Sequence, residues 1–219
     1  MEELIQIEKK AEENSEIAED EKLLAKKIKL MAKSELEIAK IRKQLAEKEM
    51  QLTNITQEVS ENNRNLVEKK LKITKQGILK FSEEELKEEI DTSIYNGKIA
   101  KIQKEIAILD EKIGNLEQEI AEKKQSLANE SLNLAKIREK LSKKQNSYVK
   151  AVKDQEEPLK ISKLKSEYEK QQKELINHKS KIVLKTDEIK KKENELAELK
   201  KNYCFKLADR EKIRHSNSC

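Results

Sequence analysis

A column of apolar residues recurs at every seventh position along the first third of this 219-residue chain. Its members are Ile17, Leu24, Met31, Ile38, Leu45, Leu52, Val59, Leu66 and Ile73. A helix with this period carries an apolar stripe along one side, and the stripe leaves water only by packing against another helix. The column therefore predicts a coiled-coil helix in this part of the chain.

Two further columns have the same spacing. The second consists of Ile99, Ile106, Ile113, Ile120, Leu127, Leu134, Leu141 and Tyr148, and the third of Ile161, Tyr168, Leu175, Ile182, Ile189, Leu196 and Tyr203. Together they predict an all-α fold, an elongated coiled coil of about three consecutive helices. Charged residues make up 42% of the chain, which would also allow disorder, but a disordered chain does not keep an apolar period.

Two breaks separate the predicted helices. Gly77 is typical of a helix end, and Ser82 with Glu85 forms a capping box that starts the next helix, with Phe81 and Leu86 at the positions of a hydrophobic staple. The second break lies between Gln155 and Pro158, where we expect a kink, a reversal or the first residue of a new helix.

The predicted layout follows from these breaks. It consists of an N-terminal helix over 1–76, a break at 77–82, a central helix over 83–156, a C-terminal helix over 157–212 and a disordered tail over 213–219. The heptads of the central helix are clearest over 99–148. A continuous rod would reach roughly 300 Å. Helices folded back on one another are the alternative, and the sequence leaves both open.

The central helix has a second seam column that mixes apolar and charged residues. The apolar members are Ile102, Leu109, Leu116 and Ile137; the charged ones are Lys123, Glu130 and Lys144. In a parallel homodimer each charged residue would face its own copy. In an antiparallel or heteromeric pair it can face an opposite charge, so we interpret these three as residues that specify partner or register.

Alanine occupies the position directly after the first column. The residues are Ala18, Ala25, Ala32, Ala39 and Ala46. Small side chains in phase could admit a neighbouring helix on this flank. We favour the simpler interpretation that alanine is the best helix former and occupies these positions because they require no larger side chain.

The sequence predicts no catalytic, cofactor-binding or metal-binding residues, and hence no enzyme. The three glycines are too dispersed for a phosphate-binding loop, and Cys204, His215 and Cys219 do not have zinc-finger spacing. The first residues lack a secretory signal, and the longest apolar run, Ile106–Leu109, is far too short to span a membrane. The net charge of +5 is spread thinly, which makes nucleic acid an unlikely partner.

These observations favour a non-enzymatic structural or scaffold protein. We expect it to self-associate or to pair with another coiled-coil chain, without a small-molecule substrate, in a cytoskeletal, centrosomal or ciliary assembly. The expected location is the cytoplasm, with the nucleus as the alternative. A chromosome- or kinetochore-associated assembly factor and a vesicle tether are the competing functions.

Overall fold

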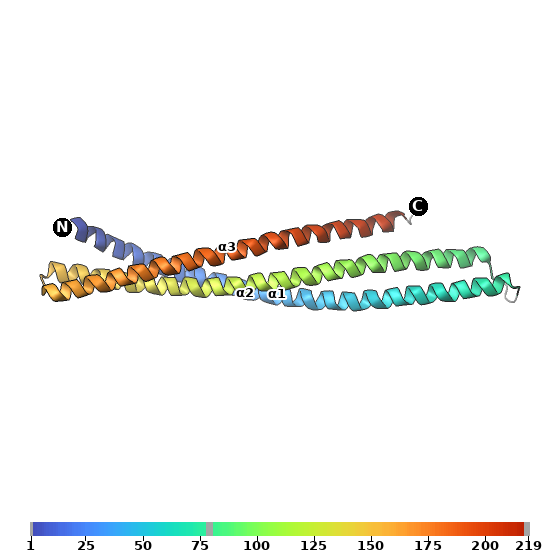
Figure 1. The fold of residues 1–219 in the computed structure, drawn as a ribbon, viewed down its shortest axis with the longest axis horizontal. Helices are drawn as coiled ribbons and strands as arrows, with labels where there is room; N and C mark the ends of the chain where they lie inside the picture. Colours follow the sequence, from blue (N-terminus) through green and yellow to red (C-terminus); the bar gives the residue numbers. More distant parts are fainter. Residues whose placement is uncertain (1, 78–80, 217–219) are drawn as a thin grey trace. The chain divides into compact units, whose positions relative to one another are not determined.

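The computed structural model describes residues 2–77 and 81–216, and these residues form three helices and no strand (Figure 1). Helix α1 spans Glu2–Lys75, α2 spans Glu83–Lys153 and α3 spans Pro158–Ser216. The predicted all-α class is confirmed. Helix α2 ends three residues before the expected position 156, and its final carbonyls bond to the turn that follows.

The C-terminal helix is longer than the sequence predicted. Residues 213–216, assigned to a disordered tail, continue α3, while residues 217–219 lie outside the described part of the chain. Arg214 pairs with Glu211 at 3.2 Å on the same helix, and ion pairs at this spacing support a terminal turn. The prediction was therefore wrong for the first four residues of the tail.

Both predicted breaks coincide with observed helix ends. Gly77 has φ +72° and donates its N–H to the carbonyl of Thr74 at 2.9 Å, a left-handed helix end that glycine adopts without strain. Ser82 Oγ accepts the N–H of Glu85 at 3.4 Å, which supplies one half of the predicted capping box. Pro158 is the first residue of α3, a position where its missing N–H costs nothing.

The helices contribute to two units, and each unit contains a segment of all three helices. Unit 1 consists of residues 1–37 and 119–193, and unit 2 of residues 38–118 and 194–219. Neither unit corresponds to a single predicted helix. Each unit is described by itself below.

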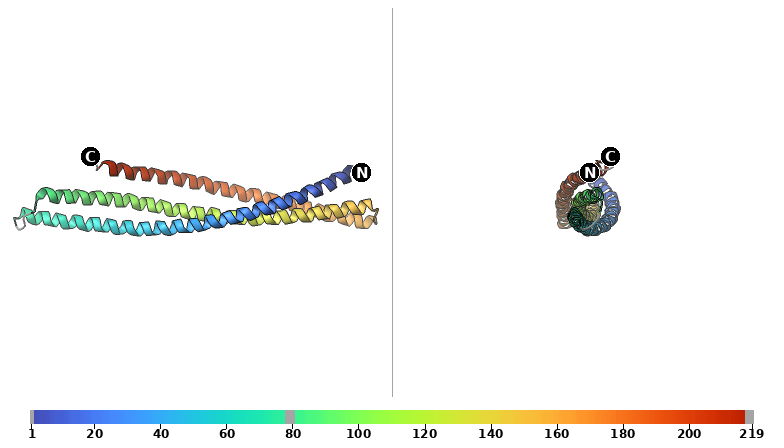
Figure 2. Two further views of the ribbon diagram at one scale, coloured as in Figure 1. Left: turned by 180° about the vertical axis from the view of Figure 1, so that it is seen from behind. Right: turned by 90° about the vertical axis from the view of Figure 1, so that its right-hand side faces the viewer.

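In unit 2, the α1 and α2 segments run in opposite directions (Figures 1 and 2). Arg42 pairs with Glu117, whereas Ser60, later in α1, lies beside Gly97, which is earlier in α2. The α3 segment is antiparallel to α2 for the same reason, since Lys200 pairs with Glu117 and Lys206 with Glu105.

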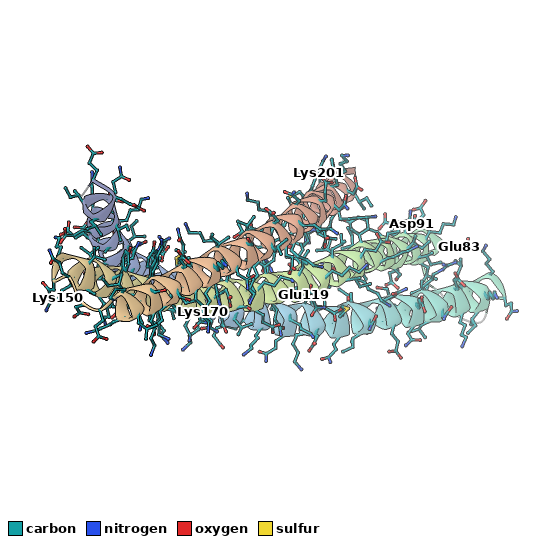
Figure 3. The ribbon with its side chains drawn as sticks, turned by 60° about the vertical axis from the view of Figure 1, so that its left-hand side comes forward. Glu83, Asp91, Glu119, Lys150, Lys170 and Lys201 are labelled. Atoms are coloured by element: carbon teal, nitrogen blue, oxygen red, sulfur yellow. The ribbon has the colours of Figure 1, made fainter. Side chains whose placement is uncertain are left out.

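Unit 1 has the same antiparallel order. Glu8 of α1 pairs with Lys153 of α2 at 2.8 Å, and Lys22 pairs with Glu139 at 2.6 Å. Exposed charged side chains such as Lys150 and Lys170 are labelled on its ribbon in Figure 3. Within each unit, therefore, the helices are folded back on one another, which is one of the two arrangements that the sequence left open.

Candidate helix–helix interfaces

The second and third predicted columns are buried or partly buried along their whole length. The same is true of the apolar residues in the second seam column of α2, Ile102, Leu109, Leu116 and Ile137. In α2 the most deeply buried member is Ile113, at 1% exposure, and in α3 it is Ile189, at 6%. The large side chains of these columns thus pack inside the chain, whereas large α3 residues outside the third column, such as Ile176 and Leu184, are exposed.

The core of unit 1 shows how α2 and α3 meet. Leu134 and Leu141 of α2 form a buried cluster with Leu175 of α3, and Ile137, Tyr168 and Ile182 pack against it. At one end of this cluster the rings of Tyr148 and Tyr168 lie 5.3 Å apart at an angle of 42°, a tilted arrangement that aromatic pairs favour. Residues of the two predicted columns therefore share one internal interface.

The three charged seam residues of α2 all contact oppositely charged or hydrogen-bonding partners on α3 in unit 1. Lys123 Nζ lies 2.6 Å from Glu188 Oε2, Glu130 Oε1 lies 2.7 Å from His178 Nδ1, and Lys144 pairs with Glu167. The hydrogen bond from Lys123 lowers the pKa of Glu188, and that from Lys144 lowers the pKa of Glu167. The antiparallel helix that supplies these partners belongs to the same chain.

Helix α1 places its columns differently. From Ile17 to Leu66 every large residue of the first column is between 41% and 63% exposed, and only Ile73 is half-buried. The alanine column is at most 1% exposed. Adjacent residues differ by about 100° around a helix, so one column faces inward while the other faces outward. Our preference for alanine as a mere helix former was wrong, because this column is the packed face.

In unit 2, the outward face of α1 carries a continuous seam, which we call the outer stripe. Its residues are Ile38, Ile41, Leu45, Leu52, Ile55, Val59 and Leu66, all between 51% and 63% exposed. Their spacing follows the three-and-four alternation of a coiled-coil seam, with Lys48 and Asn62 in the two remaining places. In unit 1, Leu24 and Met31 are exposed in the same way, together with Leu23 and Leu30.

A column of small residues in α2 was missed by the sequence reasoning. It consists of Ala100, Ala107, Gly114, Ala121, Ala128, Ala135, Ser142 and Val149, all buried. The signal was present, since these residues recur at every seventh position directly after the Ile99 column. Such columns let helix axes approach more closely than large side chains do.

Gly114 marks the close approach of α1 and α2 in unit 2. A Cβ atom placed on it would lie 3.3 Å from the backbone nitrogen of Lys43 and 3.4 Å from the carbonyl oxygen of Ala39. Both neighbours are backbone atoms of α1. The α1–α2 contact beside Gly114 is therefore made by small side chains and main chain, which explains why the large residues of the first column are left outside.

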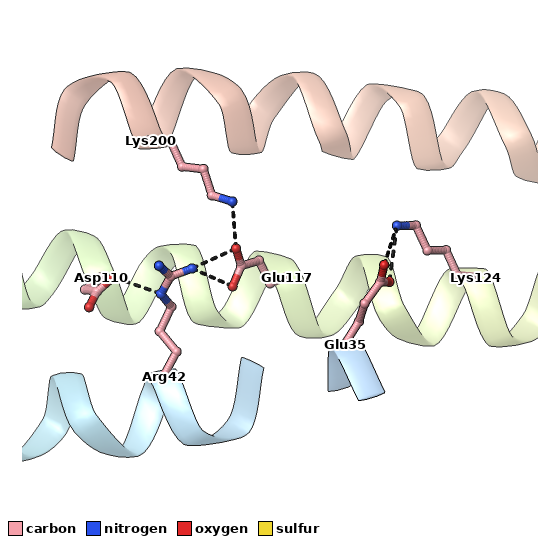
Figure 4. Close-up of polar contacts among 6 residues, drawn as sticks. All are labelled: Glu35, Arg42, Asp110, Glu117, Lys124 and Lys200. Atoms are coloured by element: carbon pink, nitrogen blue, oxygen red, sulfur yellow. Dashed lines mark hydrogen bonds and ion pairs between the residues drawn. The ribbon is translucent and has the colours of Figure 1, made fainter. Parts of the chain in front are cut away.

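A polar cluster in unit 2 joins all three helices (Figure 4). Arg42 Nη1 of α1 lies 2.8 Å from both carboxylate oxygens of Glu117, and its Nε lies 3.1 Å from Asp110 Oδ1. Lys200 Nζ of α3 lies 2.8 Å from Glu117 Oε1. Because Glu117 is matched by cations from two helices, a shift of either helix along α2 would break one of its ion pairs.

The two carboxylates of this cluster titrate in opposite directions. Burial raises the pKa of Asp110. The positive charge of Arg42 lowers this pKa, and the negative charge of Glu117 raises it by a smaller amount. Burial would also raise the pKa of Glu117, but the hydrogen bonds from Lys200 and Arg42 outweigh it and hold this pKa below its usual value. Asp110 is thus the poorly stabilised anion and Glu117 the well-stabilised one.

Unit 1 has polar contacts of the same kind. Lys124 of α2 pairs with Glu35 of α1 (Figure 4). Its Nζ atom lies 3.2 Å from Glu35 and 3.5 Å from Glu193 of α3. Nearer the end of this unit, Arg138 of α2 forms a two-pronged ion pair with Glu21 of α1. These pairs fix which turns of the helices lie side by side.

No helix in the described part of the chain is long and apolar enough to cross a membrane. Among residues 2–77 and 81–216, no group of three His, Cys, Asp or Glu side chains converges as metal ligands, and Cys219 lies outside these ranges. No protein-family model matches the chain, and no curated protein or solved structure matches it either.

Proposed function

We propose that this chain is a non-enzymatic scaffold protein that binds a partner helix along the exposed apolar face of α1. The observation that supports this proposal is the contrast between its columns. The predicted columns of α2 and α3 are buried or partly buried inside the chain, whereas the first column, on α1, is between 41% and 63% exposed from Ile17 to Leu66. An extended apolar surface of this kind is typical of a protein–protein interface.

The stripe has the chemistry of a helix-binding surface. Seven of its nine positions are aliphatic and the other two, Lys48 and Asn62, are polar. The positions repeat with the period of a coiled-coil seam. A flat aromatic or strongly charged surface would suit other ligands. The cytoskeletal, centrosomal or ciliary assembly stays a prediction from the sequence.

A test must change the outer stripe without changing the fold. Leu52→Glu places a charge on a residue that is 63% exposed, so we expect helix content and thermal unfolding to stay as in the wild type. Charge at a buried α2 residue such as Ile113 would disrupt the chain itself and test nothing about partners.

The measurement is proximity labelling in cells with wild-type and variant chains. We expect Leu52→Glu to lose the neighbours that contain coiled-coil helices. Asn54→Glu is the matched control, because it adds the same charge two residues away, at an exposed position outside the stripe. An unchanged set of coiled-coil neighbours in Leu52→Glu would contradict the proposal.

A further inference from the structure

We propose that the partner of the outer stripe is a second copy of this chain, whose residues 38–66 lie antiparallel to the same residues of the first copy. This inference rests on the proposed function and adds the identity and direction of the partner. It is built on unit 2 alone, where the whole outer stripe lies.

The exposed area is sufficient for a specific pair. Each of the seven aliphatic residues is about half-exposed, which leaves on the order of 100 Å² of apolar surface per residue. Two copies of the stripe would together remove about 1,400 Å² from water, which lies within the range of roughly 1,200–2,000 Å² for stable, specific interfaces. The stripe thus needs no additional surface to form a dimer.

The charges beside the stripe suit self-pairing. Most of the flanking positions are uncharged, including Gln44, Gln51, Thr56, Asn63 and Asn65. A partner with highly charged flanks would find few opposite charges beside the stripe, whereas a second copy has the same mostly uncharged flanks.

The two flanking positions with acidic side chains do not oppose this pairing. In an antiparallel pair centred between Leu52 and Ile55, Glu49 faces Thr56 of the second copy and Glu58 faces Gln51 of the second copy. No like charges meet on either flank. The remaining flanking charge, Arg42, is already paired with Asp110 and Glu117 inside unit 2.

Lys48 decides the direction. In a parallel, in-register pair this lysine would meet its own copy in the seam, which places two like charges together at an apolar interface. In the antiparallel pair it lies beside Val59 of the second copy, and its ammonium group can reach water along the flank. Asn62 then lies beside Leu45 of the second copy, so neither polar residue faces itself.

The experiment uses two full-length chains that carry Cys204→Ser and Cys219→Ser, one with Lys48→Cys and the other with Val59→Cys. The chains carry different tags and are mixed at equal concentration with a short thiol-specific crosslinker. We expect a crosslinked product that contains both tags. We expect much less product from either chain alone, because identical positions lie far apart in an antiparallel pair.

Sedimentation equilibrium on the uncrosslinked protein completes the test. The wild type and Asn54→Glu should have twice the mass of one chain, and Leu52→Glu should raise the dissociation constant about a hundredfold or more, since a charge would be buried at the central layer. Efficient self-crosslinking of Lys48→Cys would show a parallel pair and overturn the inference. A wild-type monomer would also overturn it, yet the proposed function would survive if Leu52→Glu still removed neighbours in cells.

Discussion

Arg138 of α2 holds the carboxylate of Glu21 of α1 with two parallel hydrogen bonds, from Nε at 2.9 Å and from Nη2 at 2.8 Å. The side chains are only 10% and 22% exposed. A third contact, from Nη1 to Asn14 Oδ1 at 3.4 Å, reaches a residue about two helical turns earlier in α1. The pair therefore ties two segments of unit 1 that are more than a hundred residues apart in sequence.

Removal of either partner of this pair should destabilise unit 1. We expect Arg138→Ala or Glu21→Ala to lower the free energy of unfolding by about 2 kcal/mol, because each leaves a largely buried charge without its partner. Urea denaturation of both single variants and the double variant gives the coupling between them. Lys160→Ala is the control, since the Lys160 side chain is 60% exposed and its pair with Glu156, four residues away on the chain, is worth less than about 0.5 kcal/mol. Additive effects in the double variant would contradict the pairing.

The pKa of Glu139 depends on the register of α1 against α2. Hydrogen bonds from Lys22 and Lys143 lower the pKa of Glu139 to about 2. We expect Lys22→Ala to raise this pKa toward 4.5, which a carboxyl carbon NMR titration would measure. Since the folded-state pKa is depressed, the stabilisation is present above the unfolded value and is lost as pH falls toward 2.

Lys143→Ala serves as the comparison for this titration. Lys143 lies four residues from Glu139 on the same helix, so its effect requires only that α2 is helical. Lys22 belongs to α1, and its effect requires that α1 and α2 pack in the observed register. If Lys143→Ala shifted the pKa and Lys22→Ala did not, the α1–α2 register of unit 1 would be refuted.

The helix ends were predictable because they depend on local chemistry. Gly77, Ser82 and Pro158 each carry a signal within a few residues of the boundary, and the structure places helix ends at all three. The end of α3 was less predictable, because no glycine or proline marks it within the described residues. Ion pairs in the last turns, such as that of Glu211 with Arg214, accompany a helix that continues for about one turn beyond the predicted end.

The choice of packed face on α1 could not be made from one helix. Burial of Leu45 or Leu52 would remove more apolar surface from water than burial of Ala46 or Thr53, so a large column is the natural candidate for the interior. The structure buries Ala46 and Thr53 instead. The reason lies in the matching small column of α2, which only a comparison of the two helices would have exposed.

Two glycines of α2 should respond oppositely to alanine. At Gly97, an added Cβ would meet only Ser60 Cβ at 4.0 Å, so Gly97→Ala should stabilise the protein by about 0.5–1 kcal/mol through helix propensity. At Gly114, the added atom would press on the backbone of Lys43 at 3.3 Å. We expect Gly114→Ala to lose the propensity gain, with a difference of at least about 1 kcal/mol between the variants. Equal stabilisation in thermal unfolding would show that α1 does not approach α2 closely.

The polar cluster of unit 2 predicts opposite effects for two neutral substitutions. Burial raises the pKa of Asp110, so its charged form is disfavoured in the folded state. The stabilisation that its neutral carboxyl gives at low pH is therefore lost as pH rises through that raised pKa. Asp110→Asn should therefore raise the thermal midpoint at pH 7. The gain should shrink on acidification, because the wild-type carboxyl becomes neutral as well.

Glu117→Gln should do the reverse. Burial opposes the charged form of Glu117, but the hydrogen bonds from Lys200 and Arg42 keep its pKa low. The stabilisation from this carboxylate is therefore present above its unfolded-state pKa and is lost as pH falls through its folded-state pKa. The variant should unfold at a lower temperature than the wild type at pH 7, with a smaller difference in acid. Thermal unfolding of both variants between pH 3 and 7 distinguishes a carboxylate that is paired from one that is only buried. If both substitutions shifted the thermal midpoint in the same direction, Arg42 would not stabilise Glu117 more than Asp110.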